Sequence, residues 1–137
     1  MVRIRRKYLD DIIRTIGTED IKVITGVRRS GKSFLLDDFK KYVIENVKDA
    51  SIISFDLSSL KYEELREYHA LNDYVEKHYV NNKINFLFID EVQMCKDFEL
   101  ALNSLHASRK YDIYITGSNA FLAGSDLATL FVGRTYT

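Results

Sequence analysis

Residues 26–33 carry the clearest chemical pattern in the chain. They read Gly-Val-Arg-Arg-Ser-Gly-Lys-Ser and match the phosphate-binding pattern G-x-x-x-x-G-K-[ST]. Gly26 and Gly31 allow successive backbone N–H groups to turn toward one anion, at the start of a helix whose dipole favours negative charge. Lys32 is expected to reach the β- and γ-phosphates of a nucleotide, and Ser33 to place its hydroxyl on Mg²⁺.

The residues around the two glycines are expected to complete this loop. An apolar run, 21–24, precedes it and an amphipathic pattern follows it, as the mechanism requires, while the alternative is a chance match. Arg28 and Arg29 could contact a phosphate or a partner, or remain solvent-exposed charges that raise the local positive potential. The predicted nucleotide-binding residues are Gly26, Val27, Arg28, Arg29, Ser30, Gly31, Lys32, Ser33 and Phe34.

Two adjacent carboxylates, Asp90 and Glu91, follow the apolar run 85–89 in a pattern that looks like a Walker B motif. Asp90 is expected to hold Mg²⁺ through its water shell, as the second partner to Ser33. Glu91 would polarise the water that attacks the γ-phosphate. The alternative for both residues is an acidic turn after a buried strand.

The type of reaction and the base follow from the same stretch. A small-molecule kinase supplies its own hydroxyl nucleophile and gains nothing from a group that activates water, so Glu91 favours hydrolysis. A guanine-specific N-K-x-D sequence is also missing, because residues 82–85 read Asn-Lys-Ile-Asn. ATP is therefore the predicted nucleotide.

A third apolar run, 111–116, ends in small polar residues. If this strand lies between the strands that carry the other two motifs, Ser118 or Asn119 could reach the attacking water and the γ-phosphate. Either residue could instead cap a helix that begins near Ala120.

The elements that must position these residues alternate along the chain, which is typical of a mostly parallel α/β sheet covered on both faces. The periodicity predicts a single domain over residues 1–137, with no internal repeat or linker. Segment 59–80 is expected to be helical with a break. The predicted strands are 21–25, 51–56, 84–89 and 111–116, and the other predicted helices are 4–16, 32–47, 97–108 and 119–131.

Composition bounds the class of protein. The 20 basic and 20 acidic residues cancel, so the domain has no net positive potential that would favour binding to nucleic acid. No apolar stretch approaches the roughly 18 residues of a membrane span, and Cys95 has no internal disulfide partner, so we predict a cytoplasmic protein without a membrane partner. His69, His78 and His106 lack the spacing of a zinc site.

Taken together, these motifs resemble those of the prokaryotic AAA-type P-loop ATPases of archaea and bacteria, whose N-terminal ATPase domain is followed by a C-terminal domain of uncertain function. The resemblance covers nearly all of the chain. It rests on residues 24–33, on Phe-Ile-Asp-Glu-Val-Gln at 88–93, on Ile-Thr-Gly-Ser-Asn-Ala-Phe-Leu at 115–122, on 126–130 and on Gly133-Arg134.

The resemblance implies a three-layer P-loop sheet of the additional-strand type, ATP with Mg²⁺ as ligands, and ATP hydrolysis as the reaction. Arg134 lies where an arginine could act on the γ-phosphate held by a neighbouring subunit of a homo-oligomer, and the alternative is an exposed arginine at the end of a helix. The chain ends soon after this residue. We therefore expect a domain truncated at its C-terminus that lacks its last strand and its lid.

Three functions remain open at this stage. The first is an ATPase that couples its nucleotide state to a C-terminal domain or to an unknown protein partner. The second is a switch that holds ATP and hydrolyses it negligibly. The third is a fragment that folds without hydrolysing ATP.

Overall fold

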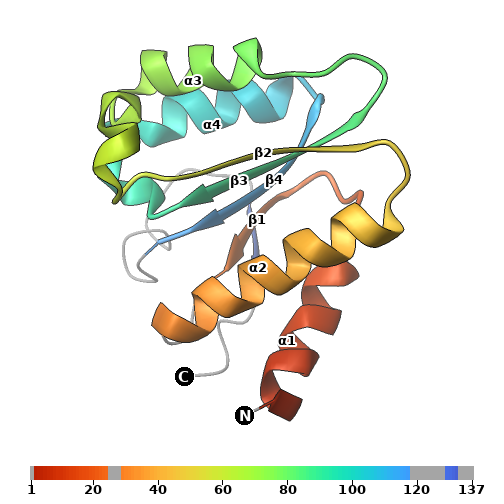
Figure 1. Cartoon of the computed structure of the whole chain (residues 1–137). Helices are drawn as coiled ribbons and strands as arrows, with labels where there is room; N and C mark the ends of the chain where they lie inside the picture. The colour runs from red at the N-terminus through yellow and green to blue at the C-terminus, as the bar shows by residue number, and fades with distance from the viewer. Residues whose placement is uncertain (1, 25–28, 118–128, 133–137) are drawn as a thin grey trace.

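The computed structural model describes the backbone of residues 2–24, 29–117 and 129–132, and the side chains of residues 7, 9–24 and 35–117. A parallel sheet lies between two pairs of helices, with α1 and α2 on one face and α3 and α4 on the other (Figure 1). The elements are α1 (Val2–Ile13), β1 (Ile21–Ile24), α2 (Arg29–Asn46), β2 (Ala50–Asp56), the 3-10 helix η1 (Leu60–Leu65), α3 (Tyr68–Lys77), β3 (Ile84–Asp90), the 3-10 helix η2 (Val92–Met94), α4 (Phe98–Ala107), β4 (Tyr111–Thr116) and β5 (Thr129–Val132).

The described strands form one five-stranded sheet in the order β2-β3-β4-β1-β5, and every neighbouring pair is parallel. The predicted α/β class, the three layers and the parallel sheet are therefore confirmed. The third apolar run, β4, lies between β3 and β1, which is the position on which the predicted role of its polar end depends.

The two faces of the sheet are separated by strict alternation along the strands, as the two-residue period of a strand requires. On β3, Leu87 and Ile89 join the core under α3 and α4, whereas Phe86 and Phe88 join the core under α1 and α2. Phe39 of α2 closes the second core, with its ring centroid 5.8 Å from that of Phe88. Both faces of the sheet are thus buried, which explains the continuous apolar runs in the sequence.

The expectations for the end of the chain need correction. Residues 119–131 were expected to form a helix, yet Thr129–Val132 is the strand β5, paired with β1 through Ile21↔Thr129 and Ile24↔Val132. The sheet therefore does not lack a strand beside β1. Residues 129–132 read Thr-Leu-Phe-Val, a run too short for periodicity to distinguish a strand from the end of a helix.

The expected break within 59–80 is confirmed, since η1 ends at Leu65 and α3 begins at Tyr68. Glu67 between them caps α3, because its carboxylate accepts hydrogen bonds from the backbone N–H groups of His69 (2.8 Å) and Ala70 (3.1 Å). These bonds and the helix N-terminus stabilise the charged form, and the pKa of Glu67 is lowered, chiefly by the bond from His69.

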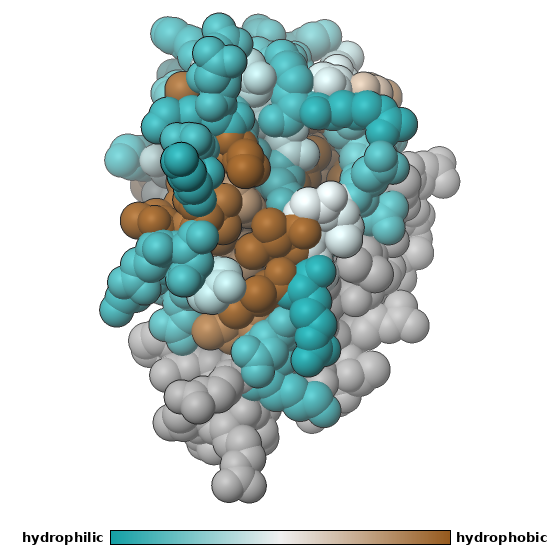
Figure 2. All heavy atoms as spheres, turned by 90° about the vertical axis from the view of Figure 1, so that its right-hand side faces the viewer, coloured by the Kyte–Doolittle hydropathy of each residue, from teal (hydrophilic) through white to brown (hydrophobic). Residues whose placement is uncertain are grey.

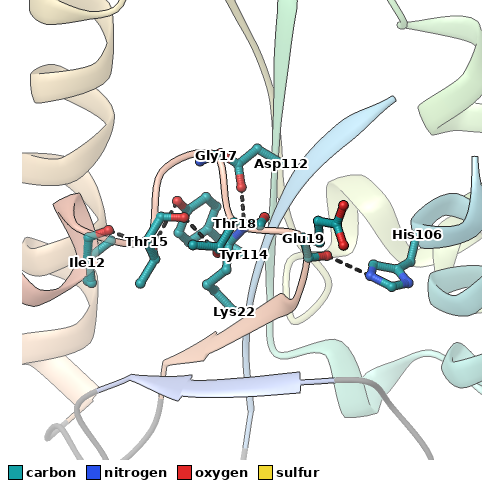
Figure 3. A network of polar contacts seen from close by, with 9 residues as sticks. All are labelled: Ile12, Thr15, Gly17, Thr18, Glu19, Lys22, His106, Asp112 and Tyr114. Carbon is teal, nitrogen blue, oxygen red and sulfur yellow. Dashed lines mark hydrogen bonds and ion pairs between the residues drawn. The ribbon is translucent and has the colours of Figure 1, made fainter. Parts of the chain in front are cut away.

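A buried polar network joins the end of α1 to β1 and β4 at the edge of the sheet where the strands begin (Figure 3). The ammonium group of Lys22, which is fully buried, forms an ion pair with Asp112 and donates to the carbonyl oxygen of Thr18 at 2.9 Å. The same carboxylate accepts from the N–H of Gly17 at 3.0 Å. Gly17 has a φ of 85°, a conformation that residues with a Cβ rarely adopt.

The same edge faces the viewer in Figure 2, where apolar side chains gather in a band bordered by hydrophilic ones. Ile84, the first residue of β3, leaves 48% of its surface exposed. A shallow hollow nearby is lined by the start of β4 and by the segment that precedes β1. Because the strands are parallel, Asp90 and Glu91, at the end of β3, lie at the opposite edge.

Candidate functional site

The carboxyl ends of the strands meet at one edge of the sheet and bring together polar groups that are distant in sequence. Asp90 ends β3 and stands in register with Asp56, which ends β2. Thr116 ends β4 and stands in register with Ile24, the last residue of β1. Ligands of open parallel sheets bind at this edge, so these groups form the candidate site.

Thr116 links the two predicted acidic residues. Its hydroxyl donates a hydrogen bond to Oδ1 of Asp90 at 3.0 Å and accepts one from the backbone N–H of Glu91, also at 3.0 Å. The side chain of Thr116 is buried, so this geometry is held without competition from solvent. One hydroxyl on β4 therefore fixes both the Asp90 carboxylate and the start of the turn that carries Glu91.

The pKa of Asp90 is raised above its ordinary value, mainly because burial disfavours the charged form. The hydrogen bond from Thr116 opposes this effect, repulsion from Asp56 adds to it, and Lys40 of α2 opposes it through its positive charge. Repulsion from Glu91 contributes less. A bound cation would stabilise the charged form of a carboxylate that is partly desolvated and lies close to other acids.

Glu91 leaves the strand in a left-handed conformation, with φ 54° and ψ 52°. Such a conformation is uncommon for a residue with a Cβ, and it is often found at functional sites. The turn that follows is η2, whose first residue, Val92, is fully buried in the core under α3 and α4. The amide Nε2 of Gln93 donates a hydrogen bond back to Oε1 of Glu91 at 2.9 Å.

Asp56 is fixed by the turn that follows β2. Its Oδ1 accepts hydrogen bonds from the backbone N–H (2.9 Å) and the hydroxyl (2.7 Å) of Ser58. The N–H of Leu57 donates to the carbonyl oxygen of Asp90 at 3.0 Å, which continues the pairing of β2 with β3 past the strand end. The two aspartates are therefore held side by side on neighbouring strands.

The donor set at this edge suits Mg²⁺. This ion usually takes one or two protein carboxylates and completes its shell with substrate phosphates and water. The Asp90 carboxylate, with its raised pKa and the neighbouring Asp56, supplies oxygen ligands where positive charge is favourable. The residues present therefore fit an ion that is shared with a phosphate ligand.

The predicted phosphate-binding residues follow β1 and continue into α2. Residues 26–28 (Gly26, Val27 and Arg28) lie outside the described residues, and residues 29–34 form the first turns of α2 in the described backbone. This strand–loop–helix order is the context that the pattern requires, and it places the N-terminus of α2 after the end of β1. Ser118, Asn119 and Arg134 lie outside the described residues, so their predicted roles stay predictions.

Three residues of this edge were missed in the sequence: Thr116, Asp56 and Gln93. Thr116 and Asp56 are the last residues of their strands, a signal that was available once the strands had been placed. The contact of Thr116 with Asp90, however, depends on β4 lying beside β3, which no local pattern reports. Gln93 reaches Glu91 because the backbone of Glu91 is left-handed and the chain turns directly into η2.

Other candidate groups do not contribute to this site. Cys95 is buried, and burial raises the pKa of its thiol to about 12, which makes it an inert structural side chain.

In the part of the chain that the structure describes, no group of three or more His, Cys, Asp and Glu residues is placed to hold a metal ion. No helix within the described ranges is long and apolar enough to cross a membrane.

Comparison with known proteins agrees with this geometry. A family profile described as "AAA domain" matches residues 18–137. An uncharacterized protein of Haemophilus influenzae is 37% identical over 133 residues, which are 95% of this chain and 33% of that protein. An uncharacterized protein of Methanocaldococcus jannaschii is 34% identical over 123 residues, which are 83% of this chain and 24% of that protein.

A solved structure, that of PCH-2 from C. elegans, shares the fold. It superposes with a TM-score of 0.53 over 96% of this chain and 40% of the PCH-2 chain, at 16% sequence identity. The chain thus spans a third or less of the length of the two relatives above and less than half of that structure.

Proposed function

We propose that this chain binds Mg-ATP and hydrolyses it, because it belongs to the family of AAA domains. It is a nucleotide-binding domain of the ATPase type. One observation carries the proposal. Thr116 holds Asp90 and Glu91 at the edge of the sheet where β1 ends. At that edge the chain continues from β1 through the G-x-x-x-x-G-K-[ST] sequence into α2.

The phosphates of ATP would be held by the loop and the first turn of α2. Backbone N–H groups of residues 26–34 would face the phosphate oxygens, and Lys32 would neutralise the β- and γ-phosphates. The Ser33 hydroxyl and the Asp90 carboxylate would hold Mg²⁺. When bound, the ion neutralises charge that develops on the transferred phosphoryl group.

Glu91 would act as the general base for the attacking water. Its backbone N–H is bonded to Thr116 and it directly follows Asp90 at the end of β3, and we propose that its carboxylate faces the γ-phosphate region. Ser118 or Asn119, which follow β4 in the sequence, is proposed to contact the same phosphate. A base in this position supports hydrolysis over a switch that only holds ATP, which remains the alternative.

The use of the hydrolysis energy is a further part of the proposal. Since the relatives are about three times as long as this chain or longer, we propose that the nucleotide state is coupled to further protein, in the same polypeptide or in a partner. Arg134 would act across a subunit interface in a homo-oligomer, where it would raise turnover more than binding. We propose a cytoplasmic location, to which the single cysteine is suited.

Calorimetric titration of Mg-ATP, with phosphate release measured on the same samples, tests this function. We expect Lys32→Ala to abolish binding, and Glu91→Gln to retain binding while phosphate release falls at least a hundredfold. Lys41→Ala on the exposed face of α2 and Glu63→Gln in η1 are the matched controls, and both should behave as the unaltered chain. Binding without phosphate release would favour the switch, and an absence of binding would refute both functions.

A further inference from the structure

Gln93 lies beside the candidate site and contacts the carboxylate of Glu91. It lies in η2, two residues after Glu91, and its Nε2 donates a hydrogen bond to Oε1 of Glu91 at 2.9 Å. An ionised carboxylate only accepts hydrogen bonds, so the amide must present its NH₂ to Glu91 and its oxygen elsewhere. That oxygen, Oε1 of Gln93, is buried and has no hydrogen-bond partner among the described residues.

A buried acceptor without a partner is costly, so the side chain of Gln93 keeps this conformation for the sake of another interaction. The contact that its amide makes in the structure is the bond to the Glu91 carboxylate. Side chains that accept such a cost are found where a functional group must be held in place.

The turn beneath Gln93 is well anchored. Met94 donates its backbone N–H to the carbonyl oxygen of Glu91 and Cys95 donates to that of Val92, both at 3.0 Å. Val92 and Cys95 are both buried in the core under α3 and α4. The amide of Gln93 is therefore presented from a rigid base, and Glu91 is held at its N–H, at its carbonyl oxygen and at its carboxylate.

We propose that Gln93 is a positioning residue for Glu91: its amide fixes the orientation of the carboxylate that activates water. This inference rests on the proposed function, since it assigns a partner to the proposed base. Gln93 acts through Glu91 and has no contact with the nucleotide in this role. Its loss should therefore lower kcat and leave the binding of Mg-ATP unchanged.

The test compares Gln93→Leu, which keeps the size of the side chain and removes the donor, with Gln93→Glu, which replaces the donor by a second carboxylate. A misplaced catalytic group commonly costs about a hundredfold in rate, so we expect kcat to fall between about tenfold and a hundredfold in both variants. In Gln93→Leu the Kd for Mg-ATP should stay close to that of the unaltered chain, and the Tm should not fall, because the variant also removes the buried oxygen that has no partner. Met94→Leu, in the same turn with its side chain 41% exposed, is the control that should leave kcat unchanged.

A second comparison separates positioning from a general structural effect. Glu91→Asp shortens the side chain, so the amide of Gln93 can no longer hold its carboxylate. Adding Gln93→Leu to this variant should then lower kcat by less than twofold.

An unchanged kcat in Gln93→Leu, an equal loss in the Glu91→Asp background, or a loss of Mg-ATP binding together with kcat would overturn the inference. A chain that binds Mg-ATP without any turnover would refute the proposed hydrolysis, and this inference with it. Normal turnover that does not respond to Gln93→Leu would refute this inference alone.

Discussion

The buried ion pair of Lys22 and Asp112 offers a sharp test of the forces that hold β1 in the sheet. Lys22→Met removes the ammonium group and keeps most of the volume of the side chain. The change deletes the ion pair, the bond to the carbonyl oxygen of Thr18 and the contact with the ring of Tyr114, whose centroid lies 4.8 Å from Nζ. It also leaves the Asp112 carboxylate buried without its cation.

The expected cost follows from this last effect. Removal of one partner from a buried ion pair typically costs about 3–5 kcal/mol, because the remaining charge is uncompensated. Lys22 is fully buried and Asp112 is 8% exposed, so solvent offers little relief. The N–H of Gly17 still donates to the carboxylate at 3.0 Å, which favours the lower end of the range. We expect a loss of about 3 kcal/mol, or roughly 12 °C in Tm for a domain of this length.

A second substitution should recover much of this loss. Asp112→Asn in the Lys22→Met background keeps an acceptor for the N–H of Gly17 and removes the buried charge. We expect the double variant to be about 2 kcal/mol more stable than Lys22→Met alone. Urea unfolding followed by circular dichroism measures these differences, provided that the slope of the free energy against urea is unchanged.

Glu19→Gln is the matched control. Glu19 pairs with Arg109 near the same network at 2.9 Å, but the two side chains are 80% and 74% exposed. An exposed pair contributes about 0–1 kcal/mol, so this variant should be nearly neutral. A loss below about 1 kcal/mol in Lys22→Met, or an Asp112→Asn change that lowers stability further, would refute the reasoning.

Three further outcomes are expected. Thr116→Val removes the hydrogen bond that opposes the raised pKa of Asp90, so the loss of Mg²⁺-dependent ATP binding on acidification should move to higher pH; an unshifted acid limb in Mg²⁺ titrations across pH would contradict this. The raised pKa means that the folded state favours the protonated Asp90 carboxyl, so its ionisation lowers stability as the pH rises from about 3.8, the value in the unfolded chain, through the raised value. Asp90→Asn should therefore raise the free energy of unfolding of the nucleotide-free chain at pH 7 by about 0.5–2 kcal/mol, and with it the Tm, while Mg²⁺ binding is lost. A lower Tm in thermal unfolding at pH 7 would contradict this. The Cys95 thiol, buried and with a pKa of about 12, should react with a disulfide reagent only as fast as the domain opens, and a reaction rate independent of added urea would be inconsistent with its burial.

The central strands and the two acids could be predicted from the sequence because each depends on a short stretch. The run 85–91 alternates Phe86 and Phe88 with Leu87 and Ile89 and ends in carboxylates, so its burial and its acidic end were both readable locally. The loop pattern was equally local. These are the parts of the fold that do not depend on which strands become neighbours.

The residues that could not be predicted depend on long-range pairing. Thr116 reaches Asp90 because β4 pairs with β3, and Lys22 is fully buried because Asp112 on β4 neutralises it. The residues around Lys22 do not indicate that it pairs with Asp112. Thr129–Val132 became a strand because β1 offered it an unpaired edge, which is a property of the sheet and not of the segment.

The insertion of β4 between β1 and β3 separates the ends of the two strands that precede the predicted phosphate loop and the two acids. Adjacent strands lie about 4.8 Å apart, so the ends of β1 and β3 stand roughly 10 Å from each other. A ligand long enough to touch both ends, such as a chain of phosphates with its cation, would bridge them. Such a ligand would connect the end of β1 to the end of β3 across β4, and its hydrolysis would break that connection.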